Sequence, residues 1–292
     1  MMHQRHWPIS NNFHRQTKQS AGSLFGIQPE KDITMPKFAA NLSMLFTEVD
    51  FLDRFKAAAQ AGFQGVEYLF PYAFDAGEIK RKLDDNQLTQ VLFNLPAGDW
   101  DAGERGIAVD PTRIEEFQAG VAMAIEYAKV LGNTQINCLA GITPKGVTPQ
   151  DAHATFVVNL RYAAQELKKA GINLVIEAIN TRDIPGFFLN TTEQAKAVIN
   201  DVGSDNLFIQ YDIYHMQIME GDITPTVSAN INQIAHVQLA DNPGRHEPGT
   251  GEINYPFVLS QLDQLGYQGW VGCEYKPQST TTDGLNWMNQ YR

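Results

Sequence analysis

Four residues that could bind a metal ion each lie near the end of an apolar run typical of a β-strand. They are Glu177 in NLVIEAIN, Asp212 in LFIQYDIYH, Gln238 in IAHVQLADN and Glu274 in WVGCEYKP. Three carboxylates and one amide carbonyl favour Mg²⁺, or Mn²⁺, over zinc, which prefers His and Cys. A cation bound there would act as a Lewis acid on a substrate carbonyl and its neighbouring hydroxyl. We therefore predict that the four residues share one divalent metal site.

Glu177 and Glu274 could also transfer protons. Each follows a buried apolar stretch, where a charged side chain is costly unless it is paired or metal-bound. A structural carboxylate is the alternative for either residue taken alone. Two carboxylates at the ends of different strands can lie on opposite faces of a small substrate, so that one removes a proton and the other returns one. We predict that Glu177 and Glu274 are the catalytic acid and base.

Three further residues are candidates for substrate binding. His215, in DIYH, could form a hydrogen bond with a substrate oxygen. Arg245, in the Gly/Pro-rich segment NPGRHEPG, is suited to clamp a carboxylate. Lys276, in EYKP, could bind the same group, although a purely structural role fits it equally well. His236 lies two residues before Gln238 on the same predicted strand, so we expect it to support the site from deeper in the fold.

Strand-like and helical stretches alternate from Lys37 onward, and this alternation indicates how the candidate residues are positioned. Several strand-like runs, such as LVI, LFI and WVG, are continuously apolar, as expected when both faces of a parallel sheet are buried. The predicted strands cover residues 38–44, 65–70, 88–95, 135–141, 172–180, 206–214, 234–241 and 270–275. The predicted helices cover residues 50–62, 76–86, 112–132, 148–171, 191–203, 223–233, 256–266 and 282–292.

Eight such pairs predict a (βα)8 barrel, the TIM barrel, in which residues at the carboxyl ends of the strands face the active site. A doubly wound sheet is the alternative, but its Gly-rich phosphate turn is absent after the first strand, which continues as ANLSML. Capping signals support two helix starts: Thr112 with Glu115, and Thr148 with Asp151. We see no domain boundary between Met35 and Arg292.

Two long Gly/Pro-rich loops, residues 96–111 and 242–255, interrupt the alternation. Loops of this length are uncommon in compact domains unless they are functional. The first contains Trp100, Glu104 and Arg105, which are further candidates for the mouth of the site, each with a structural role as the alternative. Phe70 could line the same pocket or simply pack.

Composition narrows the class of protein. The net charge of -11 argues against a nucleic-acid surface, which needs clustered Lys and Arg. Cys138 and Cys273 both lie in apolar runs, so we expect two buried, reduced thiols and no disulfide framework. The chain contains no apolar run near the ~20 residues of a membrane span. These features predict a cytoplasmic protein with neither a nucleic-acid nor a membrane partner.

Residues 1–34 differ from the rest of the chain. They are rich in Gln, His, Ser and Asn and show no clear periodicity. They also lack the apolar core of a secretory signal. We predict that this segment is a disordered extension, or that translation begins at Met35; an organelle-targeting peptide is the weaker alternative. Residues 35–292 are then a single catalytic barrel domain.

From Met35 to Arg292 the chain resembles the hydroxypyruvate isomerases, a family within the xylose isomerase-like barrel superfamily. The matching stretches are FAANLSMLF, GVEYLFPY, FNLPAGDWDAGERGIA, LVIEAIN, IQYDIYHMQ, HVQLADNPGRHEPGTGEINYP and GWVGCEYKP. Related sugar isomerases and epimerases carry His where this chain has Gln238, which should weaken the binding of softer metals.

The resemblance implies the same roles for the candidate residues. Glu177 and Glu274 would be the proton donors and acceptors, and both would bind magnesium together with Asp212 and Gln238. His215 and Arg245 would contact the substrate.

The resemblance also implies an activity, the interconversion of hydroxypyruvate and 2-hydroxy-3-oxopropanoate (tartronate semialdehyde) in glyoxylate metabolism. The partner would be a small anionic 2-oxo acid, and a homo-oligomer is possible. The 2-oxo-tetronate isomerases are the nearest alternative, because FAANLSMLFTE and VLFN resemble them as well. A metal-dependent nuclease and a non-catalytic binding barrel are alternatives from other classes. The acidic composition argues against the first, and the two glutamates argue against the second.

Overall fold

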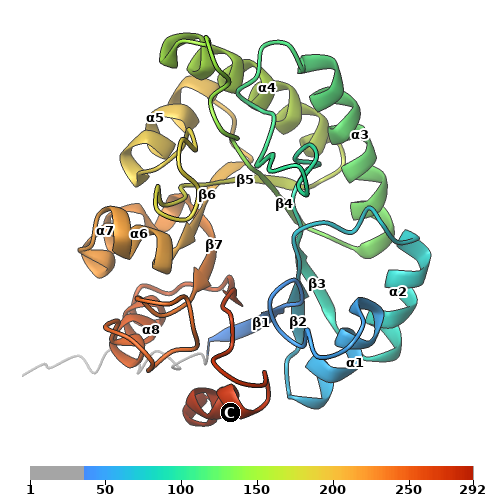
Figure 1. Ribbon diagram of the computed structural model, residues 1–292, viewed down its shortest axis with the longest axis vertical. Helices are drawn as coiled ribbons and strands as arrows, with labels where there is room; N and C mark the ends of the chain where they lie inside the picture. Colours follow the sequence, from blue (N-terminus) through green and yellow to red (C-terminus); the bar gives the residue numbers. More distant parts are fainter. Residues whose placement is uncertain (1–35, 292) are drawn as a thin grey trace, which may run out of the picture. The chain divides into compact units, whose positions relative to one another are not determined.

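The computed structural model describes residues 36–291, in which eight parallel strands surround a common centre (Figure 1). The strands are β1 (Lys37–Asn41), β2 (Gly65–Glu67), β3 (Thr89–Leu92), β4 (Gln135–Cys138), β5 (Asn173–Glu177), β6 (Leu207–Asp212), β7 (Ile234–Leu239) and β8 (Trp270–Cys273). Their order in the sheet is β3-β2-β1-β8-β7-β6-β5-β4. A single bridge between Asn94 and Asn137 joins the two edges, beyond the end of β3 and within β4. The strands are thus nearly closed into a barrel, and the predicted TIM barrel is confirmed.

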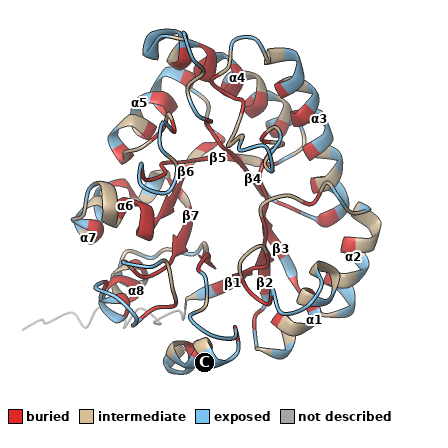
Figure 2. Cartoon of the chain, viewed as in Figure 1, coloured by how far each residue is buried: buried red, intermediate tan, exposed pale blue. Residues whose placement is uncertain are grey.

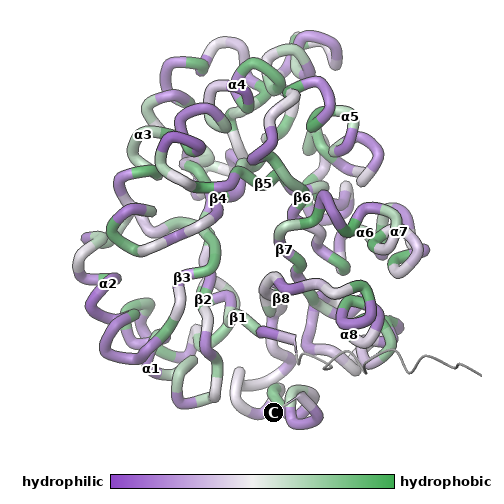
Figure 3. The backbone as a smooth tube through the Cα atoms, turned by 180° about the vertical axis from the view of Figure 1, so that it is seen from behind, coloured by the Kyte–Doolittle hydropathy of each residue, from purple (hydrophilic) through white to green (hydrophobic). Residues whose placement is uncertain are grey.

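Helices cover the outside of the barrel. They are α1 (Phe51–Gln60), α2 (Ala76–Asp85), α3 (Ile114–Leu131), α4 (Pro149–Lys169), α5 (Thr192–Val202), α6 (Ile213–Met219), α7 (Ile223–Asn230) and α8 (Tyr255–Gln264), with 3₁₀ helices η1 (Ile231–Gln233) and η2 (Asp283–Tyr291). Figure 2 shows the strands buried along most of their length, while the helices carry exposed residues on their outer side. In Figure 3 the helical turns alternate between hydrophobic and hydrophilic residues, as expected of amphipathic helices.

The spacing of apolar residues explains why the helices pack as they do. In α3, Phe117, Val121, Ala124 and Ala128 are buried and recur every three or four residues, which places them on one face. The predicted cap on α4 is confirmed: the Thr148 hydroxyl accepts a hydrogen bond from the Asp151 N–H at 3.1 Å.

The predicted strands extend past the observed ends of the strands, and two of the local differences bear on the site and its helices. Thr112 does not cap α3, because the helix begins at Ile114 and the Thr112 hydroxyl donates to Asp110 instead. The predicted sixth strand, residues 206–214, ends at Asp212, where α6 begins at once. The Asp212 carboxylate accepts the free N–H groups of Tyr214 and His215, and this cap turns the chain from strand into helix.

The side chains that point into the barrel form two layers, an apolar layer, called the floor below, and a polar layer nearer the carboxyl ends of the strands. Inside the barrel, Val175 packs in a small cluster with Phe208 and Trp270. Glu177 lies two residues beyond Val175, and Glu274 lies four residues beyond Trp270. Side chains at even spacing on a strand share one face, so both carboxylates also point into the barrel, above the floor.

Three expectations about the rest of the chain have different outcomes. Cys138 and Cys273 are buried and free, as predicted. Within residues 36–291, the helices are all too short or too polar to cross a bilayer. The extension predicted for residues 1–34 lies outside the described part of the chain.

Candidate active site

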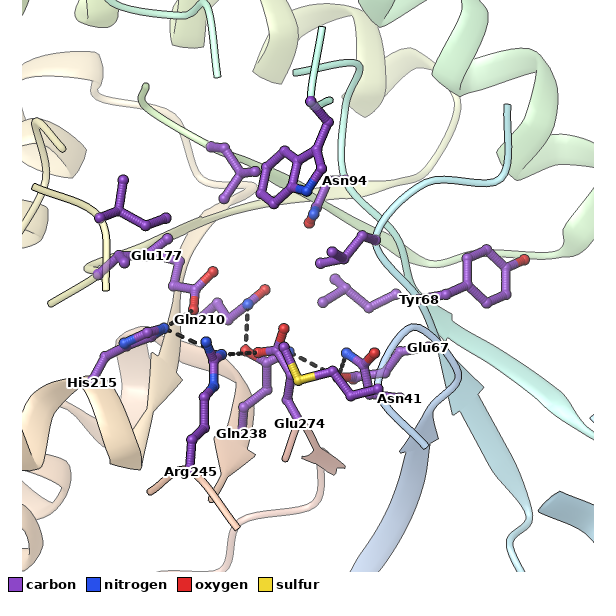
Figure 4. A pocket seen from close by; sticks show the side chains of 17 residues that line it. Asn41, Glu67, Tyr68, Asn94, Glu177, Gln210, His215, Gln238, Arg245 and Glu274 are labelled. Carbon is purple, nitrogen blue, oxygen red and sulfur yellow. Dashed lines mark hydrogen bonds and ion pairs between the residues drawn. The ribbon is translucent and has the colours of Figure 1, made fainter. Parts of the chain in front are cut away.

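A cavity lies at the carboxyl ends of the strands, and every strand contributes to its wall directly or through the loop that follows it (Figure 4). Its volume is about 80 Å³. The polar residues in the wall are Asn41, Glu67, Asn94, Glu177, Gln210, His215, Gln238, Arg245 and Glu274. Trp100, Leu139, Ile179 and Ile184 are among the apolar ones. A small apolar cavity with convergent polar groups is the usual form of a ligand site.

The two predicted catalytic glutamates, Glu177 and Glu274, both face this cavity and are both buried. Burial raises the pKa of Glu177 well above its usual value, and the negative charges of Glu274 and Asp212 raise it further. Burial also raises the pKa of Glu274, to about 8, although Arg245 beside it acts in the opposite direction. Carboxyl groups with raised pKa values can both accept and donate protons near neutral pH.

Arg245 lies among these carboxylates. Its Nη2 atom is 3.3 Å from Glu274 Oε2 and 3.7 Å from Asp212 Oδ2, and its Nη1 atom is 3.6 Å from Asp183 Oδ2. Its backbone, in the loop after β7, adopts a left-handed conformation with φ 57°. The side chain points from this loop into the cavity (Figure 4). The guanidinium therefore supplies a positive charge at the cavity, where an anionic substrate group could bind.

Three residues are close enough to hold a metal ion. Glu177, Asp212 and His215 each offer one ligand atom, and these atoms lie within 4.8 Å of one another. Asp212 Oδ2 is buried and, among the described residues, has no hydrogen-bond partner. A buried carboxylate oxygen left in this way is suited to a cation, so the residues present fit a divalent metal.

Gln238, the predicted amide ligand, lines the same cavity but is held by other side chains. Its Oε1 accepts a hydrogen bond from Gln210 Nε2 at 2.6 Å, and its Nε2 donates to Glu67 Oε1 at 2.8 Å. The Gln238 carbonyl would have to give up the bond from Gln210 before it could coordinate a metal.

Glu67, at the end of β2, is a site residue that the sequence analysis missed. Its carboxylate accepts hydrogen bonds from Gln238 and from Asn41 Nδ2 at 3.1 Å, and lies 2.7 Å from His236 Nε2. His236 is thus deeper in the barrel and supports the site, as its spacing from Gln238 suggested. Glu67 ends an apolar run in the same manner as Glu177, so the strand-end rule could have found it.

Lys276 lies apart from the cavity. Its side chain is exposed, and its backbone is joined to the loop after β7: the N–H donates to the Arg245 carbonyl at 2.8 Å, and the carbonyl lies 2.6 Å from His246 Nδ1. Of the two residues predicted to hold a substrate carboxylate, the structure therefore places Arg245 at the cavity and Lys276 outside its wall.

The long loop of residues 96–111 contributes an aromatic wall. Trp100 lines the cavity, Phe70 packs against it with ring centres 5.2 Å apart, and the Arg105 guanidinium lies over the Trp100 ring, 4.2 Å from its centre. Glu104 forms an ion pair with Arg113. Arg105 and Glu104 thus have structural partners that hold Trp100 and its loop in place.

Comparisons with known proteins agree with this architecture. The family model described as "Xylose isomerase-like TIM barrel" matches residues 55–291. The chain is 59% identical to a hydroxypyruvate isomerase of Escherichia coli (strain K12) over 258 residues, which cover 88% of this chain and 100% of the relative. It is 48% identical to a 2-oxo-tetronate isomerase of Cupriavidus necator, over 88% of this chain and 99% of the relative.

Solved structures share the fold. A structure described as an AP endonuclease, family 2, from Brucella melitensis has a TM-score of 0.87 and 48% identity, and covers 88% of this chain and 100% of its own. A D-allulose 3-epimerase from Methylomonas sp. has a TM-score of 0.68 at 22% identity, over 87% of this chain and 90% of its own, a likeness of fold alone. The matching family model and the relatives with 59% and 48% identity show that the chain belongs to the hydroxypyruvate and 2-oxo-tetronate isomerase family of xylose isomerase-like TIM barrels and is an isomerase, in agreement with the buried glutamate pair at its cavity.

Proposed function

We propose that the protein interconverts hydroxypyruvate and 2-hydroxy-3-oxopropanoate (tartronate semialdehyde). The observation that carries this proposal is the pair of buried glutamates, Glu177 and Glu274, with raised pKa values at one cavity. The relative with 59% identity is named for this substrate. A cavity of about 80 Å³ also suits an acid of a few carbon atoms, since pockets for drug-sized ligands run to about 300–1,000 Å³.

The reaction moves one proton between neighbouring carbons. One glutamate removes a proton from C3 of hydroxypyruvate, and the electron pair of that C–H bond forms an enediolate across C2 and C3. The other glutamate delivers a proton to C2, while the proton of the C3 hydroxyl is transferred to the C2 oxygen, so that C3 becomes the aldehyde and C2 carries the hydroxyl group. Arg245 binds the substrate carboxylate and keeps the carbon atoms between the two glutamates.

We retain Mg²⁺, or Mn²⁺, as the proposed cofactor. Glu177, Asp212 and Glu274 would hold it through carboxylate oxygens, with Gln238 as the fourth predicted ligand. When bound, the cation would supply Lewis-acid polarisation of the carbonyl and hydroxyl oxygens of the substrate.

Proton NMR in D₂O tests the proposal directly. The purified protein is incubated with hydroxypyruvate in the presence of Mg²⁺ or of EDTA, and with 2-oxo-tetronate in parallel. We expect conversion of hydroxypyruvate with deuterium incorporated at the carbon that receives the proton. Failure to convert or exchange either acid would overturn the proposal.

A second candidate is the isomerisation of 2-oxo-tetronate. Identities of 48% and 47% to 2-oxo-tetronate isomerases favour it over other sugar isomerases. The two activities use the same proton transfer and differ by one carbon of the substrate. Conversion of the four-carbon acid alone in the parallel sample would assign the protein to this second activity.

A further inference from the structure

The side chain of Asn180, which follows β5, has one possible orientation. Its Oδ1 atom accepts hydrogen bonds from the backbone N–H groups of Arg182, at 3.0 Å, and Asp183, at 2.8 Å. The oxygen must face these two donors, so the amide nitrogen faces the other way. That nitrogen lies 2.6 Å from Nδ1 of His215. Asn180 and His215 are both buried.

This contact decides which ring nitrogen of His215 carries the proton. The Asn180 amide is a donor, and the Asn180 backbone N–H, at 3.5 Å, points to the same Nδ1 atom. Nδ1 must therefore be the unprotonated acceptor, because a proton there would set two N–H groups against each other at 2.6 Å. The neutral imidazole then carries its proton on Nε2.

The contact with Asn180 also excludes a charged ring, because an imidazolium would carry a proton on Nδ1 as well as on Nε2. The ring nitrogen Nε2 lies 3.4 Å from Arg245 Nη2. The opposite tautomer would accept from Arg245 at that longer distance but would lose the 2.6 Å bond from Asn180. The shorter contact, to a fixed partner, favours the Nε2–H form.

Among residues 36–291, the Nε2–H group has no acceptor within hydrogen-bond length, so it can donate to a ligand. It lies 3.7 Å from Glu177 Oε1 and 3.6 Å from Asp212 Oδ2, both beyond good hydrogen-bond length, and His215 lines the cavity. We infer that Asn180 is a positioning residue that holds His215 in its Nε2–H tautomer, so that His215 donates a hydrogen bond to a substrate oxygen and is not a metal ligand. This inference rests on the proposed isomerase function.

Two consequences follow for the chemistry. A donor fixed in advance stabilises the oxygen on which negative charge develops as the enediolate forms. Coordination through Nε2 would need a lone pair there and hence a proton on Nδ1, which Asn180 opposes. A cation near His215 would therefore be bound by Glu177 and Asp212 rather than by the imidazole.

Nitrogen NMR of the histidine side chains is the direct test. A long-range ¹H–¹⁵N spectrum of the full, metal-free chain, with His215 assigned by its loss in His215→Gln, distinguishes the two tautomers. We expect the Nε2–H pattern. An Nδ1–H pattern or an imidazolium pattern for His215 would overturn the inference, and this readout does not depend on turnover.

Asn180→Asp tests the positioning role. The isosteric carboxylate can accept from Nδ1, so the spectrum should change to the Nδ1–H form and kcat should fall by about 100-fold, the usual cost of one lost oxyanion donor, while KM changes little. Thr181→Asp adds the same charge at an exposed neighbouring position and should leave spectrum and kcat unchanged. An Asn180→Asp spectrum that keeps the wild-type tautomer would contradict the role of Asn180.

Titration with Mn²⁺ alone tests the exclusion of His215 from the metal site. Calorimetry should show that His215→Gln binds Mn²⁺ with an affinity within about twofold of the wild-type value, because the substitution removes no metal ligand. A loss of Mn²⁺ affinity of tenfold or more, about 1.4 kcal/mol, would show that His215 is a metal ligand and would overturn the inference. An Nε2–H spectrum in a protein that turns over neither acid would instead refute the proposed reaction and leave the tautomer assignment standing.

Discussion

At the scale of single residues, Glu177 and Glu274 have different surroundings. Glu274 lies 3.3 Å from the Arg245 guanidinium, whereas Glu177 receives a long contact, 3.4 Å, from the Asn137 amide. Burial raises the pKa of Glu274 to about 8, and the positive charge of Arg245 limits this rise. The pKa of Glu177 is raised well above its usual value by burial and by the charge of Glu274. Both carboxyl groups are therefore suited to take up and release a proton in exchange with the substrate.

Replacing either glutamate by Gln should remove proton transfer while preserving shape. We expect kcat for hydroxypyruvate to fall by about 100- to 10,000-fold in Glu177→Gln and in Glu274→Gln. Glu126→Gln, on the exposed face of α3, is the control and should retain wild-type turnover. Circular dichroism verifies folding, and near-normal turnover in both active-site variants would reject the acid–base assignment.

The raised pKa of Glu274 makes stability depend on pH. The buried carboxyl is more easily ionised in the unfolded chain than in the folded one, so its favourable contribution is complete below the usual value of 4.5 and is lost as pH rises toward about 8. Gln mimics the protonated form at every pH.

Thermal unfolding of the metal-free protein should therefore show Glu274→Gln about as stable as the wild type near pH 4 and more stable than it near pH 8. A difference between the two proteins that does not change across this range would show that Glu274 ionises normally in the folded state.

At the scale of elements, the loop after β7 carries Arg245, and hydrogen bonds to the Asp241 carboxylate hold the backbone of this loop in place. Asp241 Oδ1 accepts from the N–H groups of Asn242, at 2.9 Å, and Ile253, at 3.1 Å, while Oδ2 accepts from Gly249 at 2.8 Å. One buried side chain thus joins both ends and the middle of the loop. Its role is to hold the backbone from which Arg245 reaches the cavity.

Asp241→Asn should loosen this loop, because the amide nitrogen would face a backbone N–H. We expect KM for hydroxypyruvate to rise and the free energy of unfolding to fall by about 1–3 kcal/mol. Glu252→Gln, in the same loop but exposed, is the matched control and should change neither quantity much. An unchanged KM in a folded Asp241→Asn protein would show that the order of this loop does not affect substrate binding.

The carboxylate of Glu67 also depends on a neighbouring element. A Cβ atom at Gly272, on β8, would lie 2.4 Å from both carboxylate oxygens of Glu67, so the absence of a side chain there makes room for the Glu67 network. Gly272→Ala should disturb the hydrogen bonds to Gln238 and His236 and destabilise the protein by about 1–3 kcal/mol.

Denaturant unfolding measures this effect. Gly77→Ala, on α2, is the control, because its added Cβ would lie 3.1 Å from the Asp75 carboxylate and 3.9 Å from Arg81 Nη1, and both are side-chain ends. Equal stability of the two variants would mean that the barrel interior can move aside for the extra methyl group.

At the scale of the whole molecule, we propose that residues 35–292 form a single catalytic domain and that residues 1–34 are a separate extension. The relative with 59% identity aligns over 258 residues, the length of that predicted domain, and is covered completely. A chain beginning at Met35 should unfold at the temperature of the full chain and keep its kcat. Loss of either would show that the first 34 residues contribute to the fold or the site.

The sequence by itself determined the barrel and the candidate residues at its strand ends. Repeated apolar runs and helical spacing are local, and the alternation of side chains along a strand decides which residues face inward. The positions of Glu177, Asp212, Gln238 and Glu274 at strand ends follow from this local pattern alone. The same rule applied to β2 would have added Glu67.

Only the tertiary structure decided which of these groups meet. Glu67 and His236 are 169 residues apart, and their contact exists because the barrel closes in one register. Lys276 follows Glu274 by two residues yet lies outside the cavity. The Glu274 N–H still donates to Leu239 of β7, whereas the Lys276 N–H donates to the Arg245 carbonyl in the loop after β7, so the strand alternation no longer applies. The proton of His215 depends on an amide that two backbone N–H groups hold in place. Local pattern sets the side of a strand on which a residue lies, whereas the partners of a buried polar group are set by long-range packing.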